Sequence, residues 1–168
     1  GNICNASPSA DTASILLALD ATVTTVSGKD GNRDIKITEF FKGVKKTCLE
    51  PGELVTEINI PELKSGEGAA YFKHAVRKAM DLAIIGVASW VKMDGKKIVD
   101  CRIAVGGAAT TPFRAKEAEQ ILIGQEYSEA LLEKAAAAAA GACKAISDVR
   151  ASAEYRADMV RVFTKRSF

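Results

Sequence analysis

Residues that could bind a phosphate or a nucleotide are concentrated in the first twelve positions of the chain. Gly1, Asn2, Ser7 and Asp11 stand among small residues, directly ahead of the apolar run 13–19. Where such a segment opens a helix, backbone N–H groups and hydroxyls are free to bind phosphate. Asp11 would then accept from a ribose hydroxyl, or it would only cap the helix, because Asp before a helix commonly accepts from backbone N–H groups. The residues by themselves favour the cap.

Other reactive side chains do not form a site that the sequence reveals. The cysteines are widely spaced and form no C-x-x-C pair: Cys4, Cys48, Cys101 and Cys143. This spacing suggests neither a zinc site nor an iron–sulfur cluster, and free thiols in a reducing cytoplasm are the simplest interpretation. His74 is the single histidine, so the chain has no histidine triad of its own, and we expect a structural role for it.

Composition excludes several classes of function. The chain has 168 residues, of which 48% are hydrophobic and 26% are charged, as in an ordinary soluble globule. Its net charge of +2 is spread along the sequence and gives no reason to expect nucleic acid as a partner. No apolar run approaches the roughly 20 residues that span a bilayer, and no signal peptide is visible, so we expect a cytoplasmic protein without a membrane segment.

The elements that must hold the first loop follow it directly. Periodicity predicts a helix over 11–19 and β-branched residues predict a strand over 22–26. A turn over 27–32 and a strand over 33–37 would complete a hairpin. A short helical turn follows at 38–41, and a strand over 54–60, with Leu54 and Val55 on opposite faces, ends at Pro61.

The polar segment 62–68 contains two glycines and predicts a domain boundary. After it, strands are expected over 70–76, 83–93 and 97–105, the last two joined by a type I′ turn at Asp94-Gly95. Gly106-Gly107 would end the sheet, either as a plain turn or as a backbone nest for an anion. Residues 68–168 therefore predict an antiparallel sheet of three strands followed by helices on one face.

Three helices are expected after the sheet. The first would run over 113–122, and Ser128 and Ser152 would cap the second and third. A run of alanines in the second helix permits close packing. In the third helix an apolar stripe would face the core and the basic residues would lie on a solvated face; the stripe is Tyr155, Met159, Val162 and Phe163, and the basic residues are Arg156, Arg161 and Lys165.

Five sequence motifs follow one another in the same order as in one known family. They are the opening loop, 50–61, Tyr71-Phe72-Lys73 with 77–83, Gly106 to Ala115, and Ser147 to Arg156. Together they resemble the FAD-binding (medium) subunit of the molybdenum hydroxylase family, of the xanthine dehydrogenase and carbon monoxide dehydrogenase type. The resemblance covers essentially the whole chain.

The resemblance implies an oxidoreductase subunit of α+β fold. Residues 1–62 would be the remnant of a second FAD-binding subdomain, and residues 68–168 the C-terminal α+β domain. Electrons would pass from a molybdopterin-binding large subunit, through 2Fe-2S clusters of an iron–sulfur small subunit, to FAD and then to an acceptor such as NAD. A purine such as xanthine is the expected substrate of the complex.

The resemblance also assigns residues to the flavin site. The pyrophosphate would be approached by Gly1 and Asn2, and Ser7 would add a donor. Asp11 would accept from a ribose hydroxyl. Leu54 and Val55 would contact the flavin ring, and Lys73 would stabilise the reduced ring, although a lysine of this kind can also simply point to water. Asp81 would help to fix the loop that carries it.

Family members carry a further FAD subdomain, with another glycine-rich loop, ahead of the position of Gly1. Because this sequence does not include it, we expect the chain alone to bind FAD weakly or not at all. The apolar side of the 13–19 helix and the neighbouring strands would be exposed or paired with another chain. The alternative hypothesis is a non-catalytic docking module that binds the other subunits without holding FAD.

Overall fold

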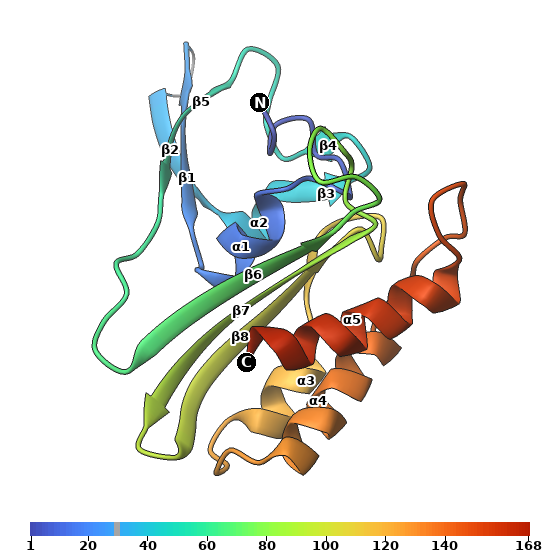
Figure 1. Cartoon of the computed structure of the whole chain (residues 1–168). Coiled ribbons are helices and arrows are strands. Elements are labelled where there is room, and N and C mark those ends of the chain that lie inside the picture. Colours follow the sequence, from blue (N-terminus) through green and yellow to red (C-terminus); the bar gives the residue numbers. More distant parts are fainter. Residues whose placement is uncertain (29–30) are drawn as a thin grey trace.

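A computed structural model describes residues 1–28 and 31–168 and arranges them in layers around a central antiparallel sheet (Figure 1). The order of its strands is β6-β7-β8-β9. They span Glu67–His74 (β6), Ile85–Asp94 (β7), Lys97–Gly106 (β8) and Phe113–Arg114 (β9). The first six residues of β7 are all buried, because both faces of the sheet are covered. This is why the segment reads as a continuous apolar run instead of an alternating one.

The turn between β7 and β8 differs from the prediction. Asp94 pairs with Lys97, so the loop consists of Gly95 and Lys96. Gly95 has a φ of +57°, whereas Lys96 is not in the positive-φ region. A positive φ at the first loop position alone is typical of a type II′ turn, so the type I′ turn predicted at Asp94-Gly95 is wrong.

Helices α3 (Lys116–Leu122), α4 (Glu129–Gly141) and α5 (Ala153–Ser167) cover one face of the sheet (Figure 1). The core beneath them includes Val87, Ile103, Val105, Leu122 and Val160, all fully buried. The side chains of Ser128 and Ser152 accept from the backbone N–H groups of Leu131 and Tyr155, which confirms both predicted N-caps.

The first of these helices begins later than predicted. Phe113 and Arg114 pair with Val105 and Ala104 as β9, so the helix starts at Lys116 rather than near Phe113. The side chain of Arg114 turns to the buried carboxylate of Glu119, with an Nε–Oε1 distance of 2.5 Å. Pairing with the edge of β8 therefore takes priority over helix propensity at these two positions.

The buried face of α5 also differs from the predicted stripe. Its buried residues are Arg156, Val160, Thr164 and Ser167. Arg156 is only 4% exposed, so its assignment to the solvated face is wrong. Because polar residues occupy inward positions, the hydrophobic pattern by itself indicated a neighbouring stripe. Arg161 and Lys165 do lie on the exposed side, as predicted, and both pair with Glu133 of α4.

The opposite face of the sheet is covered by the N-terminal part of the chain (Figure 1). Its elements are α1 (Ala13–Ala18), β1 (Thr22–Ser27), β2 (Gly31–Lys36), α2 (Ile37–Phe40), β3 (Phe41–Gly43), β4 (Lys46–Thr47) and β5 (Leu54–Asn59). The strand order β2-β1-β5 is antiparallel, and β3 pairs with β4. The turn predicted over 27–32 includes residues 29–30, which lie outside the described residues.

Helix α1 packs directly on the central sheet. Leu16 and Leu17 share a core with Ala88, Trp90 and Ala104, which belong to β7 and β8. The small alanine side chains let the helix approach the strands closely. The expectation that apolar surface here is exposed or paired with another chain is therefore wrong for the helix, whereas Leu54 and Ile58 of the neighbouring strand β5 are exposed. Within the described residues, no helix has the length and apolar character needed to cross a bilayer.

Candidate functional site

The opening loop folds back on itself through a series of turns. The backbone N–H of Asn5 donates to the carbonyl of Gly1 at 3.1 Å. The carboxamide oxygen of Asn2 accepts from the backbone N–H and the hydroxyl of Thr12, at 3.1 and 2.7 Å. Within residues 1–28 and 31–168, the backbone N–H groups of Asn2 and Cys4 donate to no other group, and both residues are exposed. These two amides are available to an anionic ligand.

Asp11 and Lys73 form an ion pair beside this loop. The Asp11 carboxylate lies 2.8 Å from the Lys73 ammonium, and the two side chains are 50% and 30% exposed. Thr12, and not Asp11, occupies the N-cap position of α1, so the capping role considered for Asp11 is wrong. Lys73 also donates to the backbone carbonyl of Asp81 at 2.7 Å. Both of its partners are anionic or polar protein groups, so Lys73 does not simply point to water.

The loop 75–83, which carries Asp81, is held at both ends. The Asp81 carboxylate accepts from the backbone N–H of Arg77 at 2.8 Å, and this hydrogen bond is the main cause that lowers the pKa of Asp81. At the base of the loop, the N–H of Ile84 donates to the carbonyl of His74 at 2.8 Å. The ring of His74 meets the hydroxyl of Tyr155 at 3.0 Å, a contact that agrees with a structural role for this histidine.

Tyr71 is a residue that the sequence analysis did not assign to the site. It precedes Lys73 by two positions in β6, on the same face of the strand. Its hydroxyl is buried and has no hydrogen-bond partner among the described residues. Burial, followed by the negative charge of Asp11, raises the pKa of Tyr71 to about 12. The ring packs closely on Gly86, where a Cβ would lie 2.9 Å from the hydroxyl oxygen, so a larger residue there would displace the Tyr71 side chain.

Leu54 and Val55 lie on β5, separate from the Asp11–Lys73 pair. In the described part of the chain, no hydrogen bond or ion pair joins either residue to Asp11 or Lys73. Leu54 is 66% exposed, and Val55 is half-buried against the core that contains α1. Ile58 and Ile60 are exposed like Leu54, so the apolar alternation of this strand faces outward.

Glu53, directly before β5, is a second residue that the sequence analysis missed. Its carboxylate is buried and accepts from Thr25 Oγ1 at 2.5 Å and from Arg33 Nε at 2.6 Å. It also accepts from the backbone N–H of Glu50 at 2.8 Å. The hydrogen bonds, that from Arg33 first, lower the pKa of Glu53 to about 2. This cluster fixes the turn from which Leu54 emerges. A glutamate in a polar segment gives no sequence signal of burial.

Comparison with known proteins identifies the class. Residues 1–63 match the model of the FAD binding domain in molybdopterin dehydrogenase, and residues 70–168 match that of the CO dehydrogenase flavoprotein C-terminal domain. The glyceraldehyde dehydrogenase medium chain of Sulfolobus acidocaldarius is 38% identical over 100% of this chain and 59% of its own length. The xanthine dehydrogenase FAD-binding subunit of Escherichia coli O157:H7 is 35% identical, over 99% of this chain and 57% of the relative.

A solved structure of carbon monoxide dehydrogenase from Hydrogenophaga pseudoflava superimposes with a TM-score of 0.94 at 32% identity, covering 99% of this chain and 57% of that chain. The fold and the ordered motifs thus resemble those of the medium subunits of molybdenum hydroxylases. Since one model covers more than half of the sequence, the chain belongs to the CO dehydrogenase flavoprotein C-terminal domain family. The chain spans less than two thirds of the length of these relatives.

Proposed function

We propose that this chain is the C-terminal part of an FAD-carrying medium subunit. Residues 1–62 would complete an FAD-binding subdomain, and residues 68–168 would form the C-terminal α+β domain. The observation that carries the proposal is the partly exposed Asp11–Lys73 ion pair, which lies beside the loop 1–12, where the amides of Asn2 and Cys4 have no acceptor among the described residues. The FAD-binding model matches the segment that contains this loop.

The chemistry of these residues fits one side of an FAD molecule. The amides of Asn2 and Cys4, unpaired within the part of the chain that the structure describes, suit phosphate oxygens, and the Asp11 carboxylate suits a ribose hydroxyl. Gly1 would let the backbone approach the pyrophosphate closely, and Ser7 would donate its hydroxyl to the same group. Lys73 would place a positive charge near the flavin ring.

The remaining contacts with the ring would come from β5. The exposed side chain of Leu54, with Val55 beside it, suits an apolar ring face. To contact both β5 and the Asp11–Lys73 pair, FAD would have to extend from one to the other.

When bound, FAD supplies the ability to accept electrons and to pass them to an acceptor. We propose that the complete subunit receives electrons from the 2Fe-2S clusters of a small subunit, supplied in turn by a molybdopterin-binding large subunit, and passes them to an acceptor such as NAD. A purine of the xanthine type is the proposed substrate. The relatives are named for glyceraldehyde, xanthine and carbon monoxide. An activity assay of the complete enzyme must therefore test aldehydes and carbon monoxide beside purines.

The proposal is tested with the full-length subunit encoded by the source gene. Wild-type protein should bind one FAD, measured by its absorbance and by quenching of flavin fluorescence. Asp11→Asn and Lys73→Gln should each weaken binding by about tenfold, the loss expected for one charge-assisted hydrogen bond. Glu39→Gln, at an exposed position of α2, is the matched control and should bind normally. Failure of the wild-type full-length subunit to hold FAD would contradict the proposal.

A docking role without FAD is the second candidate. Exposed apolar side chains favour it, and they occur in the loops 75–83 and 143–151: Val76, Met80, Leu82, Ile146 and Val149. Met80 is 96% exposed, and such side chains are common at protein interfaces. A full-length subunit that assembles with its partner subunits but never holds FAD would establish this role in place of the first.

A further inference from the structure

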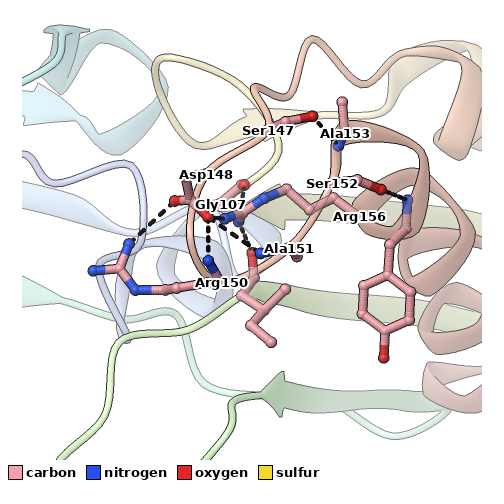
Figure 2. Close-up of polar contacts among 10 residues, drawn as sticks. Gly107, Ser147, Asp148, Arg150, Ala151, Ser152, Ala153 and Arg156 are labelled. Atoms are coloured by element: carbon pink, nitrogen blue, oxygen red, sulfur yellow. Dashed lines mark hydrogen bonds and ion pairs between the residues drawn. The ribbon is translucent and has the colours of Figure 1, made fainter.

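A buried arginine lies where the loops of the proposed FAD site meet. Arg156 is in the first turn of α5, and its side chain is 4% exposed (Figure 2). A positive charge near a helix N-terminus is disfavoured by the helix dipole. Burial of a guanidinium also costs free energy unless its N–H groups are paired. The position of Arg156 therefore has to be explained by what its guanidinium holds.

The guanidinium binds three acceptors from three different segments. Nη1 donates to the carbonyl of Ile84 and, at 3.0 Å, to the carbonyl of Gly107. Nη2 donates to Asp148 Oδ1 at 2.8 Å. Figure 2 shows these contacts converging on the side chain. A planar guanidinium can reach several acceptors at once, whereas a lysine ammonium acts as a single point charge.

Asp148 is held in turn by its own loop. Its carboxylate accepts from the backbone N–H groups of Arg150 and Ala151, at 2.9 and 3.2 Å (Figure 2). The pKa of Asp148 is lowered, chiefly by the N–H of Arg150 and also by the Arg156 guanidinium. The Asp148 carboxylate is thus held by its own loop as well as by Arg156, and it gives the guanidinium an anionic partner of defined position.

Each backbone carbonyl that Arg156 holds belongs to a residue that also fixes a loop of the candidate site. The N–H of Gly107 donates to the carbonyl of Pro8 at 2.7 Å, in the loop that leads to Asp11. The N–H of Ile84 donates to the carbonyl of His74, at the base of the loop that carries Asp81. The carbonyl of Asp81 accepts from Lys73. Both sides of the Asp11–Lys73 pair are thus connected to one guanidinium.

We propose that Arg156 is a positioning residue of the FAD site, fixing the 1–12 and 75–83 loops through Gly107 and Ile84. This inference rests on the proposed function. Arg156 touches neither Asp11 nor Lys73, and it acts by setting the geometry of the two loops that present them.

The test compares Arg156→Lys with Val160→Ala in the full-length subunit. Val160 lies one turn further along α5 and is fully buried, so its truncation should destabilise the protein without loosening either loop. The dissociation constant of FAD should rise roughly tenfold or more in Arg156→Lys, the factor that follows from losing hydrogen bonds to a charged group. It should stay near the wild-type value in Val160→Ala.

Hydrogen exchange of the FAD-free protein supplies the second readout. The amides of Gly107 and Ile84 should exchange roughly tenfold faster in Arg156→Lys, while amides in the middle of β8 keep their protection. Asp148→Asn removes the charge that orients Arg156 and should shift both measurements in the same direction by a smaller factor. It replaces Arg156→Lys if that variant does not fold.

The outcomes separate the two proposals. If the wild-type subunit binds no FAD, the proposed function fails, and the exchange data alone decide whether Arg156 fixes the loops. If FAD affinity falls equally in Arg156→Lys and Val160→Ala, Arg156 has only a general structural role and the inference is overturned. Unchanged exchange at Gly107 and Ile84 would overturn it as well.

Discussion

Substitution of Gly107 tests how closely this residue approaches the backbone of Ile84. Its φ is +77°, and a Cβ built on it would lie 2.7 Å from the carbonyl oxygen of Ile84. Gly124, at the end of α3, has a similar φ of +83°, but a Cβ there would meet nothing within 4 Å. The two positions therefore share the backbone conformation and differ in the space around it.

The loss of stability expected for an alanine at each position has two contributions, the left-handed backbone conformation and the space available for the Cβ. A left-handed φ costs an alanine about 1–2 kcal/mol, and the stiffer unfolded chain returns about 0.4–1 kcal/mol of this. Gly124→Ala should therefore lower the free energy of unfolding by only about 1 kcal/mol. Gly107→Ala adds the overlap with a backbone atom that cannot rotate away, a further cost of about 1–3 kcal/mol for overpacking.

Urea unfolding of both variants, followed by circular dichroism, measures the difference. With a slope of about 1–3 kcal/mol/M, the midpoint of Gly107→Ala should lie about 1 M below that of Gly124→Ala at an unchanged slope. Equal midpoints would refute the close approach of Gly107 to Ile84, and with it the argument that this peptide needs a glycine.

Three further predictions concern single side chains. Glu53 has a folded pKa of about 2 against an ordinary value of 4.5, so its carboxylate should stabilise the fold fully above pH 4.5 and lose that contribution as the pH falls toward 2. The difference in urea midpoint between wild type and Glu53→Gln should therefore shrink on acidification. A difference that stays constant with pH would contradict this. Tyr71→Phe should leave the thermal midpoint unchanged or raise it, because the hydroxyl is buried without a partner in the described structure; a clear loss of stability would reveal a missing partner. Burial raises the pKa of the Cys101 thiol to about 12, so a thiol reagent should label exposed Cys4 first and Cys101 only on unfolding, as peptide mass mapping would show. Early labelling of Cys101 would argue against its burial.

Local sequence patterns predicted the elements well where the local preference and the packing agree. The caps Ser128 and Ser152 are examples, because each satisfies backbone donors only three residues away. The same patterns gave wrong predictions where residues distant in the sequence determine the secondary structure or the burial of a side chain. Phe113 became a strand residue because the edge of β8 was available to it. The face of α5 was misjudged because Arg156 finds its partners in Ile84, Gly107 and Asp148.

The same division applies to the candidate site. The ordered motifs indicated Asp11 and Lys73, but their separation of 62 positions in the sequence gave no reason to place them in contact. Their 2.8 Å ion pair exists because α1 packs on β7 and β8 while β6 pairs with β7, which brings both residues to the same edge. Tyr71 and Glu53 became visible only through burial, which depends on neighbours from other elements.

The class of the protein, the antiparallel sheet with its helices and the loop from which an anion site could be built were all predictable from the sequence, because they depend on local composition, spacing and motif order. Two features depend on the packing of distant elements: α1 covers the second face of the sheet, and Asp11 pairs with Lys73 instead of capping the helix. The burial of Arg156 depends on this packing as well. Burial and pairing are properties of the whole packed chain, since a charged side chain is stable in the interior only when residues far away in the sequence supply its partners.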